Sequence, residues 1–318
     1  MTSTDIAVGI ANEDWAGDAR YFEYSAAADP IRSGHTPRIP IHQFPASLHV
    51  GRPTGVTPLD LSGDLGLASG PATSPALLAS FVCIGTGEQL ETRATATSEL
   101  FIVLRGSGRS TIGDHVLAWG EGDLFVVPCG DGAVHEADDD AAFYWVTDEP
   151  LLRYLGVAPI EARFAPTYFP AARLAAELAI VAEDRLAVAR SRVSVLAATA
   201  SQSQTLTVTH VLWAMYGLLP VGAVQRPHRH QSVALDLIVD AAPGCYSLLG
   251  AKLDDQGEII DPVRVDWESG GAFVTPPGMW HAHINESGVP ARLLPIQDAG
   301  LHTYLRSLDI RFAPAPPT

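Results

Sequence analysis

The chain has 318 residues, of which 47% are apolar and 18% are charged, a balance that predicts a folded protein with a substantial core. Its formal charge of −16 argues against nucleic acid or an acidic membrane surface as a partner, because both are negatively charged. Three widely spaced cysteines argue against a disulfide framework or a thiolate zinc cluster, and the lack of a signal-peptide pattern or a long apolar span favours a cytoplasmic protein.

Residues 1–75 contain eight prolines and few periodic apolar runs, so this segment is expected to be irregular. Its apolar residues, among them Ile39, Phe44 and Leu48, would be costly to leave in water. We therefore expect an N-terminal arm that wraps the body of the protein or a neighbouring subunit, rather than a loose tail.

Residues 76–158 form a first block of short β patterns that are punctuated by glycines. Strands are expected at 77–84, 99–104, 115–118, 124–128 and 143–146. Strands of this length and spacing are typical of a sandwich or a small barrel.

Residues 159–204 are predicted to be a helical linker. Within them, 170–198 is rich in Ala, Leu, Glu and Arg, lacks Gly, and repeats its apolar residues at helical spacing. Pro170 suits the first turn of a helix, which is expected to end either near Ser191 or at 198.

The β pattern returns in residues 205–318. Strands are expected at 205–218, 232–240, 245–249, 264–267, 272–275 and 292–296. This segment is therefore predicted to be a second β domain.

The two β blocks resemble copies of one unit. The spacing G-x5-P-x-G occurs from Gly122 to Gly130 and again from Gly270 to Gly278. Each block also ends with a strand, an acidic turn and an amphipathic segment rich in Leu and Tyr. Self-similarity on this scale indicates an internal duplication.

The second block carries the strongest chemical signal. His228 and His230 are two residues apart, so on a strand both imidazoles point to the same face. His281 follows in the pattern G-x5-P-x-G-x2-H-x3-N that begins at Gly270, whose turn aims the chain back toward the other two rings. Three imidazoles suit Fe, Mn, Ni, Cu or Zn.

These segments, PHRHQSVAL at 227–235 and WHAHINES at 280–287, resemble the two metal-binding motifs of the cupins. Ala234 stands where the first motif usually has Glu, and three His without Glu is the pattern of the gentisate/salicylate 1,2-dioxygenase group of bicupins. The resemblance implies an all-β fold with minor α content, in which two small β-barrels of the double-stranded β-helix or jelly-roll type are joined by a helical linker. It implies metal ligation by His228, His230 and His281.

The first block departs from the metal pattern. Thr92 and Ala94 occupy the places of the first two His, and His135 is displaced by two residues from the place of the third. Only Glu99 keeps its spacing to the following glycine. The N-terminal cupin, 76–158, is therefore expected to be metal-free, with a weak Glu99/His135 site as the alternative.

Other departures concern the substrate. The HRH segment lies in the second cupin rather than the first, and Asp236 stands where the group has an Arg that is thought to hold a substrate carboxylate. An Asp would repel a carboxylate, so an amine-bearing or neutral ring is favoured. In the turn after the last strand, Pro295 replaces one acid while Asp298 remains.

Four residues around the three His are candidates for contact with substrate. Asp236 is expected to face the lumen as an amine partner or general base, unless it pairs with an Arg or points outward after a bulge. The resemblance implies that His283 forms a hydrogen bond with substrate. The alternative is a supporting position or one at the rim. Trp280 either packs at the barrel mouth or stacks on substrate, and Arg226 is a candidate replacement for the missing Arg.

The resemblance implies an Fe(II)-dependent, ring-cleaving dioxygenase of the extradiol, gentisate-like type, with O2 as co-substrate and Mn, Ni, Zn or Cu as alternative metals. Its substrate would be a small hydroxy- or amino-substituted aromatic compound that chelates the metal, as in aromatic catabolism. The alternatives are a non-oxidative metal-dependent cupin enzyme (an isomerase, lyase or hydrolase) and a non-catalytic metal-binding bicupin. A homo-oligomer, either a dimer or a tetramer, is expected.

Overall fold

The structure is a computed structural model that describes residues 16–130, 132–184 and 193–314. The chain divides into two compact units, residues 1–38 and 39–318. In the first, helix α2 (Tyr24–Ala27) is capped by Glu23, whose carboxylate accepts the backbone N–H groups of Ser25 and Ala26. Within the described ranges, no helix is both long and apolar enough to cross a membrane.

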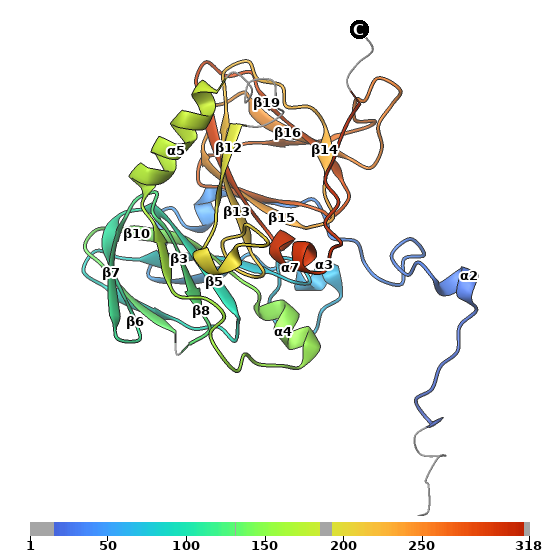
Figure 1. Cartoon of the computed structure of the whole chain (residues 1–318), viewed down its shortest axis with the longest axis horizontal. Helices are drawn as coiled ribbons and strands as arrows, with labels where there is room; N and C mark the ends of the chain where they lie inside the picture. Colours follow the sequence, from blue (N-terminus) through green and yellow to red (C-terminus); the bar gives the residue numbers. More distant parts are fainter. Residues whose placement is uncertain (1–15, 131, 185–192, 315–318) are drawn as a thin grey trace, which may run out of the picture. The chain divides into compact units, whose positions relative to one another are not determined.

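The second unit contains two β-barrels, which confirms the predicted all-β bicupin fold. In the N-terminal barrel, a six-stranded sheet of order β11-β8-β5-β10-β3-β2 faces a four-stranded sheet of order β4-β9-β6-β7 (Figure 1). The strands are β2 (Gly55–Pro58), β3 (Leu78–Ile84), β4 (Gln89–Thr92), β5 (Ser98–Arg105), β6 (Ser107–Ile112), β7 (His115–Gly120), β8 (Leu124–Pro128), β9 (Ala133–Ala137), β10 (Ala141–Thr147) and β11 (Thr167–Phe169).

The C-terminal barrel repeats this plan. Its larger sheet has the order β1-β18-β15-β20-β13-β12, and its smaller sheet has the order β17-β16-β19-β14-β21. The strands are β1 (Gln43–Phe44), β12 (Val193–Ala197), β13 (Trp213–Leu219), β14 (His228–Arg229), β15 (Ala234–Asp240), β16 (Cys245–Gly250), β17 (Val263–Asp266), β18 (Ala272–Thr275), β19 (Trp280–Asn285), β20 (Ala291–Gln297) and β21 (Arg311–Phe312).

Short helices connect and flank the strands. They are η1 (Ala46–Leu48), α3 (Ser62–Leu65), α4 (Glu149–Leu155), α5 (Ala171–Glu183), η2 (Ala200–Gln202) and α7 (Ala299–Tyr304). The helices α4 and α7 are counterparts, since they follow β10 and β20, which occupy the same place in the two larger sheets. Each is preceded by a buried aspartate: Asp148 accepts the backbone N–H of Ser98, and Asp298 accepts that of Val233.

The two larger sheets pack against each other through one apolar layer. Because side chains alternate along a strand, Leu100 and Ile102 of β5 point into the same core cluster as Leu235 and Leu237 of β15. Residues of the opposite parity, such as Phe101 of β5, point into the barrel interiors instead. Each larger sheet therefore has one face for the layer between barrels and one face for its own interior.

The segment 39–75 contributes to this body. Gln43 and Phe44 pair with β18, and Phe44, Leu59 and Leu61 lie in the core cluster between the barrels. The side chain of His49 is also buried, and its Nε2 lies 3.0 Å from the carbonyl oxygen of Gly270. The predicted domain boundaries themselves remain a prediction.

Two predictions of local structure were wrong. The helix predicted to reach Ser191 or 198 ends at Glu183, and Val193–Ala197 form strand β12 along β13; residues 185–192 lie outside the described ranges. β-Branched Val193 and Val195 favour this pairing. The strand predicted for 205–218 begins only at Trp213, because the hydroxyl of Thr209 accepts the N–H of Leu212 and holds a turn there.

The interior of the N-terminal barrel holds two buried titratable groups. Glu99, only 3% exposed, accepts the indole N–H of Trp145 at 3.0 Å, and burial raises the pKa of this carboxyl to about 8. Burial likewise lowers the pKa of His135 to about 4, and its Nε2 lies 2.9 Å from the hydroxyl of Thr92. Both groups are therefore neutral near pH 7.

We predict that Glu99→Gln flattens the pH dependence of stability between pH 6.5 and 8. The pKa of Glu99 is raised on folding to about 8, so its contribution is fully present below the unfolded value of 4.5 and is lost as pH rises through about 8. Over this interval the wild-type free energy of unfolding should fall by up to about 1.4 kcal/mol per pH unit from this group. His135 is present in both proteins, so its titration cancels when the slope of Glu99→Gln is compared with that of the wild type.

Urea denaturation at pH 6.5, 7.25 and 8 measures this slope. The exposed Glu121→Gln is the matched control and should keep the wild-type slope. Equal slopes for wild type and Glu99→Gln would show that Glu99 does not carry the pH dependence.

Candidate metal centre

The three predicted ligands lie together at one end of the C-terminal barrel. His228 of β14 pairs directly with His281 of β19, and their ring centroids are 4.0 Å apart. The ring of His230 lies 4.9 Å from that of His281 and 6.3 Å from that of His228. All three side chains are buried, and β21 covers the outer edge of β14, where Phe312 stacks on His228.

The Nδ1 atom of each ring lies close to a backbone carbonyl oxygen. The partners are Arg226 at 3.3 Å for His228, Ser232 at 2.8 Å for His230 and Met279 at 3.0 Å for His281. A carbonyl oxygen only accepts, so each Nδ1 carries the hydrogen and each Nε2 keeps its lone pair. This arrangement is the usual one for a metal-binding histidine, whose other nitrogen donates to a carbonyl or carboxylate. The donor set therefore fits a divalent transition metal.

His283 is a fourth imidazole beside this set. Potential ligand atoms of His228, His281 and His283 all lie within 4.8 Å of one another, whereas His230 stands outside that tighter group. Two overlapping sets of three are thus present. The sequence predicted the set that contains His230, and this ligand assignment remains a prediction.

The hydrogen bonding of His283 differs from that of the other three rings. Its Nδ1 lies 2.7 Å from the hydroxyl of Ser247, which also accepts the indole N–H of Trp267 at 2.8 Å. Since the buried hydroxyl needs an acceptor for its own proton, it donates to Nδ1 of His283. The hydrogen of a neutral His283 then sits on Nε2, which makes this ring a donor and favours His230 as the third ligand.

The N-terminal barrel contains the same chain of three side chains. Trp119 donates to Ser110 at 2.8 Å, and Ser110 lies 2.7 Å from Nδ1 of His135. Ser110 pairs with His135 across β6 and β9, as Ser247 pairs with His283 across β16 and β19. His135 is therefore the counterpart of His283, which explains its two-residue displacement from the place of the third ligand.

Asp236 lies on the interior face of β15. It is 2% exposed and accepts the hydroxyl of Thr275 at 2.6 Å. Its cross-strand neighbours are Phe273 and Pro295. Burial, together with the charge of Asp236, raises the pKa of Tyr144 in the layer between the barrels.

Arg226 and Trp280 lie outside the cavity described next. The exposed guanidinium of Arg226 donates to the carbonyl oxygen of Ala313. Trp280 is half-buried, and the guanidinium carbon of Arg229 lies 5.1 Å from the centre of its ring. Substrate contacts by Arg226 and Trp280 remain predictions that this geometry does not support.

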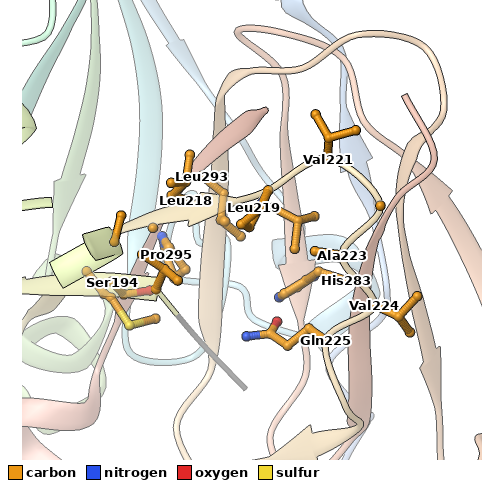
Figure 2. Close-up of a pocket in the computed structure, with 16 residues that line it drawn as sticks. Ser194, Leu218, Leu219, Val221, Ala223, Val224, Gln225, His283, Leu293 and Pro295 are labelled. Carbon is orange, nitrogen blue, oxygen red and sulfur yellow. The ribbon is translucent and has the colours of Figure 1, made fainter. Parts of the chain in front are cut away.

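A cavity of about 350 Å³ opens beside His283. It is lined mainly by apolar side chains from β13 and β20 and the loop after β13, including Met215, Leu219 and Leu293. The hydrogen-bonding side chains among its lining residues are those of Ser194, Gln225 and His283 (Figure 2). Gln225 could not be singled out from the sequence, because Pro227 leaves the strand register open and Arg226 offers a charged group in the same segment.

Named proteins resemble parts of this chain. No family model matches the sequence. Over 136 residues, 41% of the chain, it is 29% identical to 5-aminosalicylate 1,2-dioxygenase from Comamonas sp, of which the match spans 36%. Over 83 residues, 26% of the chain, it is 32% identical to gentisate 1,2 dioxygenase 1 from Aquipseudomonas alcaligenes, of which the match spans 20%. The chain thus matches about a third or less of each of these two relatives.

Solved structures match over much more of the chain. Salicylate 1,2-dioxygenase from Pseudoaminobacter salicylatoxidans, solved with gentisate, superposes with a TM-score of 0.69 at 14% identity, over 98% of this chain and 96% of that one. A cupin 2 conserved barrel domain protein from Leptotrichia buccalis gives a TM-score of 0.50 at 14% identity, over 82% and 98%. At such identities the likeness shows the fold.

We predict that Ser247→Ala and Ser110→Ala destabilise the protein to a similar extent. Each removes a hydroxyl that links a buried indole N–H to a buried imidazole. Leaving such groups unsatisfied costs about 1–3 kcal/mol in the free energy of unfolding. Urea denaturation measures the loss, and the exposed Ser69→Ala should change stability by less than about 0.5 kcal/mol. Wild-type stability in either buried variant would contradict the proposed hydrogen-bond chain.

Proposed function

We propose that this chain, a bicupin that resembles the gentisate/salicylate 1,2-dioxygenase group, is an Fe(II)-dependent, ring-cleaving dioxygenase of the extradiol, gentisate-like type. In this proposal the metal is held by His228, His230 and His281. Its substrate is a small hydroxy- or amino-substituted aromatic compound. Mn, Ni, Zn and Cu are the alternative metals for three imidazole ligands.

The observation that carries this proposal is that Nδ1 of each of the three rings lies 2.8 to 3.3 Å from a backbone carbonyl oxygen. If each Nδ1 donates to its carbonyl, each Nε2 carries the lone pair with which a histidine binds a metal. When bound there, Fe(II) would supply Lewis acidity and redox chemistry with O2. Three neutral ligands leave the metal charge uncompensated, which favours an anionic oxygen ligand such as a phenolate.

The surrounding side chains would orient the substrate. His283, held by Ser247 and Trp267, directs its Nε2–H toward an oxygen of the ring substituents. The apolar walls at Met215, Leu219 and Leu293 accept the aromatic face and exclude water. Positioning and desolvation are therefore the main contributions of the protein itself.

The relatives suggest the substrate class. Their names specify 5-aminosalicylate and gentisate, two ring compounds with a polar substituent besides the hydroxyl and carboxylate of salicylate. Here a buried Asp236 stands where the group has a carboxylate-binding Arg. A buried acid favours an amino group and disfavours a nearby carboxylate, which supports an amine-bearing or neutral ring.

We predict that the anaerobically iron-loaded protein binds about one Fe(II) per chain and consumes O2 only with an aromatic substrate. The panel pairs gentisate, salicylate and 5-aminosalicylate with 4-aminophenol, hydroquinone and catechol. Substrate-dependent uptake in an oxygen electrode is the expected result. An iron-filled protein that consumes no O2 with any of them would overturn the dioxygenase proposal and favour a non-oxidative cupin enzyme.

We also predict which histidines hold the iron. His228→Ala, His230→Ala and His281→Ala should each retain less than about a tenth of the wild-type iron after desalting, because each removes one of three ligands. His283→Ala should retain at least half. Iron content by elemental analysis, with circular dichroism to verify folding, separates the two overlapping sets. Loss of iron from His283→Ala with retention in His230→Ala would reverse the assignment.

A further inference from the structure

Gln225 is a buried amide in the wall of the candidate cavity. Its backbone N–H donates to the carbonyl oxygen of His283 at 2.8 Å, and the neighbouring residues Val224 and Ile284 form an antiparallel bridge. Gln225 therefore lies opposite His283 on adjacent chain segments. Opposed residues project their side chains to the same face, and both side chains line the cavity (Figure 2).

The amide group of Gln225 has an unsatisfied end. Its side chain is 7% exposed, and Oε1 has no hydrogen-bond partner among the described residues. The amide nitrogen points into the cavity between the apolar walls (Figure 2). A buried amide oxygen without a partner is costly, so a polar side chain at this position requires a reason.

A bound ligand would supply that reason. Rotation about the last side-chain bond of Gln exchanges oxygen and nitrogen at low cost, so the group offers the cavity either a donor or an acceptor. A ring hydroxyl or amino group is itself both a donor and an acceptor, and it can match either orientation. The remaining lining near Gln225, at Leu219, Ala223 and Leu293, offers only apolar contact.

We propose that Gln225 is a specificity-determining residue that hydrogen-bonds a neutral hydroxyl or amino substituent on the aromatic ring. The proposal rests on the proposed function, because it places the substrate in the cavity beside His283. It goes further in naming the residue that recognises the polar substituent and the chemical class of that substituent. His283 would then contact the oxygen atoms nearer the metal, while Gln225 contacts a separate group on the ring.

Two matched ligand series test this recognition. Salicylate is compared with gentisate and 5-aminosalicylate, and phenol with hydroquinone and 4-aminophenol, so that only a hydroxyl or amino group is added in each series. Dissociation constants are measured by calorimetry under anaerobic conditions with the Fe(II)-loaded protein. In the series that binds, the substituted ligands should bind about tenfold more tightly than the parent, the size expected of one neutral hydrogen bond.

Gln225→Met should reduce this preference to less than about twofold, since Met has a similar length and no amide. Gln89→Met, which makes the same change at an exposed glutamine of the other barrel, should keep the tenfold preference. If Gln225→Met does not fold by circular dichroism, Gln225→Asn withdraws the amide by one methylene and should also reduce the preference. An unchanged preference in the folded Gln225 variant, or no preference in the wild type, would overturn the proposal.

Binding and turnover are read separately. Because no O2 is present, ligand affinity reports on Gln225 without requiring a reaction. A dioxygenase whose ligand preference is unaffected by Gln225→Met would contradict this inference alone. An O2-inert protein that loses its preference in Gln225→Met would contradict the proposed function alone.

Discussion

Burial of one face of each six-stranded sheet against the other barrel constrains which side chains enter each barrel interior. Leu100 and Ile102 on one side and Leu235 and Leu237 on the other belong to a single apolar cluster. Since side chains alternate along a strand, this packing assigns the intervening residues to the barrel interiors. A shift of one residue would place an aliphatic side chain in the lumen and Asp236 in the apolar layer, at a cost of several kcal/mol.

The same constraint produces two very different interiors. Aligning the turns at Pro128 and Pro276 places Val127 opposite Glu99 in one barrel, as Thr275 lies opposite Ala234 in the other. Two residues further along these strands, Phe101 and Asp236 occupy equivalent positions. Phe101 stacks on aromatic neighbours, whereas Asp236 accepts a hydrogen bond from Thr275. The N-terminal interior thus packs aromatic rings around His135 and Glu99, whereas the C-terminal interior carries four imidazoles and Asp236 beside a cavity.

Sequence was informative wherever the signal was local and periodic. The i, i+2 spacing of His228 and His230 and the turn before His281 predicted that these rings would meet, and the repeated turn predicted two barrels. The sequence did not predict hydrogen bonds between side chains that are distant in the chain. The pairing of Ser247 with both Trp267 and His283 follows from strand register, which no local pattern specifies. Gln225 was missed for a related reason, because it enters the sheet only as a neighbour of an isolated bridge before Pro227.

The Trp–Ser–His chain that occurs in both barrels bears on how such a protein can change over generations. In the N-terminal copy the chain is present although Thr92 stands where the metal-binding motif has a histidine, and the hydroxyl of Thr92 lies 2.9 Å from Nε2 of His135. A protein with two such barrels can divide two roles between them, stability of the fold in one and a variable site in the other. One copy can accumulate large rings that secure the fold, and the other is then free to exchange residues around its histidines. New substrate preferences can therefore arise in the second barrel without first being tested against the integrity of the whole chain.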